Sequence, residues 1–288
     1  MAVTSPLVGL LLALFSSFVV AGSARIEVQV GSARTATADY WPGAAEKPAL
    51  LILHGFLQTR DFPTVRRLAE ALADEGYNVL TPTLTLGVSR RLQSLACEAV
   101  HTHSMDQDVA ELLVWVRWLH GRAGKQPVLV GHSAGGVQLA ALLEAHPDLP
   151  VEHAILISLT YFGDVDGVAS VSQLRAHAAA DLATSGDAAL QDYALNYCRR
   201  YVTTPGNLLS YLAWDAQRLG KALVTADAAV TVVYGDRDER IDKEWLDVLR
   251  EGGVEVRPVA GADHFFDLEH EFDLLDEVVA VTSGADNG

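Results

Sequence analysis

Positive charge and cysteine are both scarce in this chain of 288 residues. It carries 21 Lys and Arg against 37 Asp and Glu, a formal net charge of −16. A field of that sign repels nucleic acid and anionic membrane surfaces, so we expect no nucleic-acid partner. The composition also lacks the signatures of collagen, of a disordered chain and of a protein with several membrane spans. Half of the residues are hydrophobic, enough for a substantial core in one large domain or two small ones.

The amino terminus carries an almost unbroken apolar run, Leu7–Val20, followed by small residues at 21–24. We predict a secretory signal peptide over residues 1–24 and a bacterial protein exported to the periplasm or the medium. No Lys or Arg precedes the run, which is unusual for a signal peptide. An uncleaved anchor and a buried helix are the alternatives, although a membrane span needs about 20 apolar residues. After cleavage we expect no stable membrane insertion.

The only two cysteines are Cys97 and Cys198. In an oxidising compartment we favour one disulfide between them over two free thiols, worth roughly 3 to 5 kcal/mol in the chain-entropy model. Cys97, His101 and His103 have a spacing that could bind zinc, but no fourth ligand is evident and a disulfide would consume the thiol. We therefore expect neither a metal nor a cofactor.

Strand and helix patterns alternate along most of the chain. The expected strands cover residues 26–30, 35–40, 49–53, 78–81, 127–130, 151–159, 229–234 and 254–259. The expected helices cover residues 64–74, 104–121, 137–146, 243–250 and 269–281. This alternation predicts an α/β fold, with a mostly parallel central sheet and helices on both faces.

Residues 160–227 interrupt this alternation and contain no clear core strand. Helical patterns cover 171–182, 188–201 and 207–219 instead. We interpret the stretch as an insertion within one domain, residues 25–288.

A catalytic serine is predicted at Ser133. The sequence Gly-His-Ser-Ala-Gly at 131–135 follows a buried strand and precedes a helix, as in a nucleophile elbow. Small residues two before and two after the serine let strand and helix approach while the serine sits exposed on a strained turn. The alternative is a tight turn with an idle serine. His132 is expected to pack beside the elbow, not to react.

A serine hydroxyl is a weak nucleophile at neutral pH, so it needs a base and an acid that orients that base. His264 follows the last predicted strand and is the expected base, with a structural loop histidine as the alternative. For the acid we favour Asp238, because the turn before it carries the chain toward the histidine loop. Asp236 is its competitor, and Glu239 is a third possibility.

Backbone amides should stabilise the oxyanion that forms during acyl transfer. The Ala134 amide follows the nucleophile, and the Phe56 amide lies in the His-Gly-Phe turn after the strand 49–53. We expect both to be donors. Arg90 and Arg91 are interpreted as a solvated pair, with contact to an anionic substrate as the alternative.

Together these motifs resemble the α/β-hydrolase family over about residues 26–281, most closely its exported bacterial members. The resemblance implies hydrolysis through an acyl-enzyme on Ser133, with His264 as base and Asp238 as its partner. It also implies that the insertion is a helical cap that shapes the pocket. Residues 83–103 depart from the Asp-x-x-Gly-x-Gly-x-Ser turn of many members, so the substrate is not carried over.

The expected function is cleavage of a small-molecule carboxylic ester. The same triad serves amidases and thioesterases, so both remain alternatives. A catalytically idle binding or accessory protein is the alternative from another class. Nothing in the sequence indicates an oligomeric state.

Overall fold

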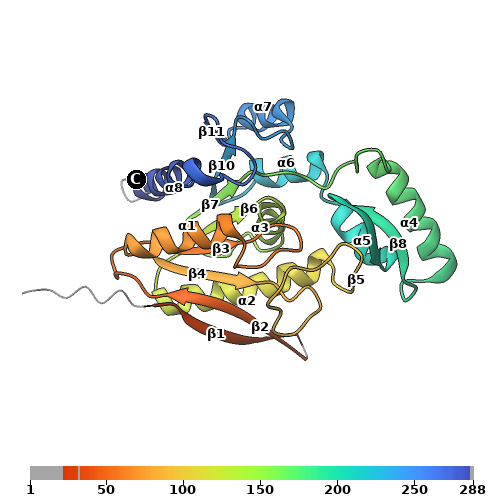
Figure 1. The fold of residues 1–288 in the computed structure, drawn as a ribbon, viewed down its shortest axis with the longest axis horizontal. Coiled ribbons are helices and arrows are strands. Elements are labelled where there is room, and N and C mark those ends of the chain that lie inside the picture. The colour runs from red at the N-terminus through yellow and green to blue at the C-terminus, as the bar shows by residue number, and fades with distance from the viewer. Residues whose placement is uncertain (1–21, 32, 286–288) are drawn as a thin grey trace, which may run out of the picture.

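The computed structural model describes residues 22–31 and 33–285 (Figure 1). The predicted signal peptide falls almost wholly outside these residues. Eight strands form the central sheet in the order β1-β2-β4-β3-β6-β7-β10-β11. Their bounds are β1 (Ala24–Val30), β2 (Arg34–Trp41), β3 (Ala49–Leu53), β4 (Asn78–Thr83), β6 (Val128–His132), β7 (His153–Ile157), β10 (Ala229–Gly235) and β11 (Glu255–Val259). The last six strands in this order, β4, β3, β6, β7, β10 and β11, are parallel to one another. β2 pairs antiparallel with both β1 and β4. This mostly parallel sheet confirms the predicted fold class.

Helices cover both faces of this sheet. They are α1 (Pro63–Asp74), α2 (Met105–Ala123), α3 (Ala134–Ala145), α7 (Lys243–Glu251) and α8 (Glu271–Ala285), the last preceded by a 3-10 turn at Leu268–His270. Within β3, Leu50 and Ile52 pack in the core under α1 and α8, whereas Leu51 and Leu53 pack in the core with α2, α3 and α7. Burial on both faces explains why β3 is a continuous apolar run.

β4 continues to Thr83, although the sequence predicts that it stops before Pro82. β3 pairs with β4 only from Asn78 to Leu80, so one edge of β4 is free beyond that point. Pro82 itself lies opposite Ala38 of β2. A free strand edge is where proline is tolerated.

The chain between β7 and β10 builds a cap at the carboxyl end of the sheet (Figure 1, right). It holds α4 (Val171–Ser185), β8 (Gln191–Leu195), β9 (Cys198–Thr203), α5 (Pro205–Leu212) and α6 (Ala216–Val224). The expected helix over 188–201 is wrong, because this stretch is the β8–β9 hairpin. β9 also pairs with β5 (Val100–His101), a partner that lies about 100 residues earlier in the chain and that no local periodicity can reveal.

The expected helix over 207–219 is two helices. Asp215 lies between them and accepts a hydrogen bond from the Arg218 amide at 3.0 Å. This N-cap starts α6 as a separate element.

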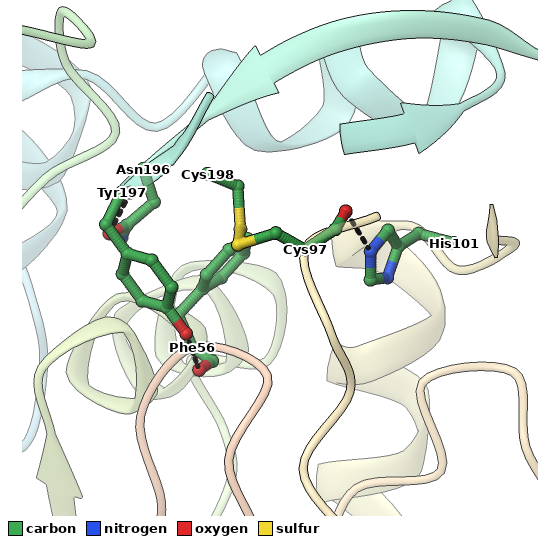
Figure 2. The surroundings of a disulfide bond; sticks show 6 residues. All are labelled: Phe56, Cys97, His101, Asn196, Tyr197 and Cys198. Carbon is green, nitrogen blue, oxygen red and sulfur yellow. Dashed lines mark hydrogen bonds between the residues drawn. A yellow bond between two sulfur atoms is a disulfide. The ribbon is translucent and has the colours of Figure 1, made fainter. Parts of the chain in front are cut away.

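A disulfide joins Cys97 to Cys198, as the sequence predicts, with 5.3 Å between the Cα atoms. It connects the loop that precedes α2 to the cap hairpin (Figure 2). Across residues 22–31 and 33–285, none of the helices is long and apolar enough to span a membrane.

Candidate active site

Ser133 lies on a sharp turn between β6 and α3, with φ 53° and ψ −125°. This conformation is strained for a residue with a side chain and costs on the order of 1–3 kcal/mol. Glycine is required on both sides of Ser133, because neighbouring backbone atoms lie where a side chain would be. A Cβ on Gly131 would lie 2.7 Å from the Gly136 amide nitrogen, and one on Gly135 would lie 2.5 Å from the His54 carbonyl oxygen. The local geometry is that of the predicted elbow.

The structure brings Ser133, His264 and Asp238 into one hydrogen-bonded line. The His264 Nε2 lies 3.1 Å from the Ser133 Oγ, and the His264 Nδ1 lies 2.7 Å from the Asp238 Oδ2. Asp238 is 2% exposed and His264 is 5% exposed. With Nδ1–H donating to the carboxylate, Nε2 is free to accept the serine proton, as a general base must.

The two other acid candidates do not contact His264. The Asp236 carboxylate accepts a hydrogen bond from the Gly261 amide at 2.7 Å and so braces the loop before the histidine. Glu239 faces the cleft instead. The geometry therefore favours Asp238 as the partner of the imidazole.

His132 has a contact that sequence reasoning missed. Its Nε2 lies 2.9 Å from the carbonyl oxygen of His264, and its ring stacks on Phe62. Burial lowers the pKa of His132 to about 4, so the imidazole is neutral and donates through Nε2. His132, the neighbour of Ser133, thus holds the backbone of His264. No local pattern indicates this contact, because 132 residues separate the two histidines.

Residues 54–58, here called the oxyanion turn after the role that the sequence predicts, lie directly against Ser133. A Cβ on Gly55 would lie 3.4 Å from the Ser133 Cβ. The Gly55 amide donates to the Gln58 side chain, and the Ser133 amide donates to the Ile157 carbonyl. The next amide in each segment is a predicted oxyanion donor, Phe56 or Ala134. Their role stays a prediction.

Two buried side chains support the oxyanion turn through hydrogen bonds to its backbone carbonyls. The His54 Nδ1 donates to the Gly55 carbonyl at 2.9 Å, and burial together with the nearby Arg91 lowers the pKa of His54 to about 3. Arg91 is 3% exposed and donates to the carbonyls of Leu57 and Gln58. The interpretation of Arg91 as a solvated or substrate-binding side chain is therefore wrong. Its guanidinium satisfies backbone carbonyls that would otherwise be buried without partners.

A cleft of about 990 Å³ opens in front of Ser133 between the sheet and the cap. Its aromatic lining residues are Phe56, Tyr161, Tyr197, Trp245 and Phe265. Its charged lining residues are Asp164, Asp166, Arg199, Asp215, Glu239, Arg240 and Asp242. The cleft therefore combines flat apolar surfaces with charge of both signs.

Cys97, His101 and His103 do not form a metal site. The Cys97 sulfur is in the disulfide, the His101 ring stacks on Tyr201 at 4.0 Å between centroids, and His103 bonds to the Tyr211 hydroxyl. In the described part of the chain no cluster of three or more His, Cys, Asp or Glu side chains could hold a metal ion.

The chain belongs to the alpha/beta hydrolase family, whose sequence model matches residues 50–278. Est1E from Butyrivibrio proteoclasticus has a TM-score of 0.61 at 15% identity, covering 92% of this chain and 100% of that one. A monoacylglycerol lipase of Paleococcus ferrophilus gives 0.63 at 15% identity, covering 87% and 99%. The thioesterase domain from the curacin biosynthetic pathway gives 0.62 at 16% identity, covering 90% and 100%. Identities this low establish the fold alone, and no curated protein sequence matches the chain.

Proposed function

We propose that this hydrolase cleaves a carboxylic ester through an acyl-enzyme on Ser133. The observation that carries the proposal is the hydrogen-bonded line from Asp238 through His264 to Ser133, which ends at the floor of an open cleft. An idle fold would have no need to keep a strained serine beside an imidazole that a buried carboxylate orients. This favours an enzyme over a binding or accessory protein.

In this mechanism His264 Nε2 takes the Ser133 proton while Oγ attacks the ester carbonyl carbon. The oxyanion of the tetrahedral intermediate binds to the amides of Phe56 and Ala134. Collapse of the intermediate breaks the ester C–O bond, and His264 gives its proton to the departing alcohol. Water then attacks the acyl-enzyme with His264 again as base. The bond between the acyl carbon and the Ser133 Oγ breaks, His264 returns its proton to Oγ, and the acid is released. Asp238 holds the imidazole tautomer and stabilises the imidazolium.

The cleft favours a short acyl group over a long one. Five carboxylates and two guanidinium groups line it. A long alkyl chain laid along these charges would remove water from them without offering hydrogen bonds, which is costly. The aromatic rings still provide apolar contact for a few carbons near Ser133.

Amide or thioester hydrolysis is the nearest alternative. Similar structures include proteins named as a lipase and as a thioesterase domain, so these similarities do not decide between an ester and a thioester substrate. We place esters before amides because an amide carbonyl is less electrophilic and its nitrogen must be protonated before it can leave. The assay described below decides between the ester and the thioester.

We also infer that the protein is exported, with residues 1–24 removed as a signal peptide. The disulfide supports this inference, because such bonds persist in oxidising compartments. The intact mass of protein recovered from the periplasm or medium should match a chain beginning near residue 25 with two fewer hydrogens. A full-length, fully reduced chain retained in the cytoplasm would contradict it.

The proposed function is tested with p-nitrophenyl esters of two to sixteen acyl carbons, beside amide and thioester analogues. We expect the highest kcat/KM for the short esters and no turnover above background by Ser133→Ala. A preference for the thioester series would move the assignment to that bond. Turnover that survives in Ser133→Ala would remove Ser133 from the mechanism.

A further inference from the structure

The tip of the cap hairpin contacts the oxyanion turn (Figure 2). Asn196 and Tyr197 form the two-residue connection between β8 and β9. Asn196 has a φ of 56°, the left-handed conformation that such short connections use. Its Oδ1 accepts a hydrogen bond from the Tyr197 amide at 2.8 Å. These features fix the backbone at the tip, from which the Tyr197 side chain points toward Phe56 (Figure 2).

Tyr197 is held there by both its hydroxyl and its ring. The hydroxyl donates to the Phe56 carbonyl oxygen at 3.2 Å. The ring packs edge-on against the Phe56 ring, with 5.6 Å between centroids and an interplanar angle of 88°. Burial of the hydroxyl raises the pKa of Tyr197, so it remains a donor at neutral pH. Tyr197 makes both contacts although the residue as a whole is 54% exposed.

The Phe56 carbonyl is a sensitive point of the oxyanion turn. It belongs to the peptide between Phe56 and Leu57, and Leu57 has a φ of 57°, which is unfavourable for a residue with a bulky side chain. Rotation of that peptide would relieve the strain at Leu57 and change the ψ angle of Phe56. The N–H of Phe56, the predicted oxyanion donor, is attached to the same Cα and would be displaced with it. A hydrogen bond to this carbonyl opposes the rotation.

Tyr197 is the cap's contribution to this turn. The neighbouring carbonyls are held from within the main domain. Their donors are His54 and the Gln58 amide for Gly55, Arg91 and the Leu95 amide for Leu57, and Arg91 for Gln58. The Phe56 carbonyl instead receives its hydrogen bond from a residue 141 positions later in the chain.

The disulfide fixes the hairpin to the same region. Cys198 follows Tyr197 directly and is bonded to Cys97. Two residues before Cys97, the Leu95 amide donates to the Leu57 carbonyl at 3.0 Å. The loop that braces one side of the strained peptide is therefore covalently tied to the hairpin that braces the other side.

We propose that Tyr197 is a positioning residue for the oxyanion hole and that the Cys97–Cys198 disulfide keeps it in place. The inference rests on the proposed serine hydrolase function. The cap then does more than enclose substrate, because it supports the Phe56 amide on which the transition state depends. The rate of acylation depends in turn on the oxidised disulfide.

The first test measures how fast a fluorophosphonate probe modifies Ser133. Tyr197→Phe keeps the ring and removes the hydroxyl. Direct loss of an oxyanion donor costs about 10²–10³ in rate, so loss of a support for the donor should lower the maximal labelling rate by roughly tenfold. The concentration giving half-maximal rate should change by less than about twofold, because phenylalanine keeps the ring that lines the cleft and the lost hydroxyl is bonded to the Phe56 carbonyl.

Tyr193→Phe is the matched control. Tyr193 lies in the same hairpin, and its hydroxyl donates to the Asp181 carboxylate at 2.8 Å, away from the oxyanion turn. Removing that hydroxyl should leave the labelling rate unchanged. The ³¹P NMR shift of the Ser133 adduct, whose phosphoryl oxygen occupies the oxyanion hole, should move in Tyr197→Phe and not in Tyr193→Phe.

The second test removes the disulfide with Cys97→Ser and Cys198→Ser together, in the wild type and in Tyr197→Phe. If the disulfide acts through Tyr197, its removal should slow labelling roughly tenfold in the wild type and by less than about twofold in Tyr197→Phe. Effects that multiply independently would overturn the coupling. A wild-type rate and ³¹P shift in Tyr197→Phe would overturn the positioning role while leaving the hydrolase intact. Folded wild type that is not labelled at all would instead remove the proposed function.

Discussion

Asp236 and Asp238 lie two positions apart in the loop after β10, yet their carboxylates have different partners. Asp238 accepts from the His264 imidazole, and Asp236 accepts from the Gly261 amide. Asp238→Ala should lower kcat by roughly 10⁴-fold, because the imidazole loses its tautomer and its counter-charge. Asp236→Ala should keep most of the activity. Steady-state kinetics on one short ester, with both variants checked for folding, would show the opposite order if the assignment were wrong.

Ser133, Asp238 and His264, which form one hydrogen-bonded line, are predictable from sequence because each follows a strand at a position that local pattern reveals. Their supports are not. His132 reaches His264 and Tyr197 reaches Phe56 across separations of 132 and 141 residues. From the sequence alone Arg91 is interpreted as a surface side chain, and only its carbonyl partners show that it is buried. Contacts between a side chain and distant backbone leave no periodic signal, so only the structure reveals them.

The strand, turn and helix of the elbow are held together by glycine contacts. Gly135→Ala would press a Cβ into the His54 carbonyl, so we expect a lower melting temperature and little activity. Gly121→Ala is the matched control, since Gly121 lies in α2 and an added Cβ there would meet nothing within 4 Å. It should raise the melting temperature by about 2 °C through helix propensity. Equal effects in calorimetry would contradict the packing account of the elbow.

The elements that are well predicted from the sequence have a local signal, such as a continuous apolar run, an apolar face or a capping residue. β3 and the elbow strand are continuous apolar runs, and Ser104 caps α2 as expected, accepting from the Gln107 amide. The cap hairpin is different. Its helix-like composition is overridden by the antiparallel pairing of β8 with β9 and by the pairing of β9 with β5, a segment of only two residues that has no strand signal of its own.

Three buried imidazoles should make the whole molecule sensitive to acid. Burial lowers the pKa of His54 to about 3 and those of His101 and His132 to about 4. Below about pH 6.5 these three imidazoles bind protons in the unfolded chain and not in the folded chain. The free energy of unfolding therefore decreases as the pH is lowered. Each group contributes up to roughly 1.4 kcal/mol per pH unit. Burial raises the pKa of Glu111 to about 7, which acts in the opposite direction, but it is one group against these three and His153, whose pKa burial also lowers.

The melting temperature should therefore fall steadily between pH 6.5 and 4.5. His101→Phe keeps the stack on Tyr201 and removes one of the three imidazoles. Its melting temperature should fall less steeply over the same range. Calorimetry at half-unit steps of pH checks this, and a slope equal to that of the wild type would show that His101 does not contribute.

Labelling of Ser133 itself tests the central claim most directly. A fluorophosphonate probe should add one adduct per folded wild-type chain, and peptide mass spectrometry should locate it on Ser133. Ser133→Ala, with the same circular dichroism spectrum, should remain unlabelled. An unlabelled wild type, or an adduct of equal yield in Ser133→Ala, would contradict the account of this chain as a serine hydrolase.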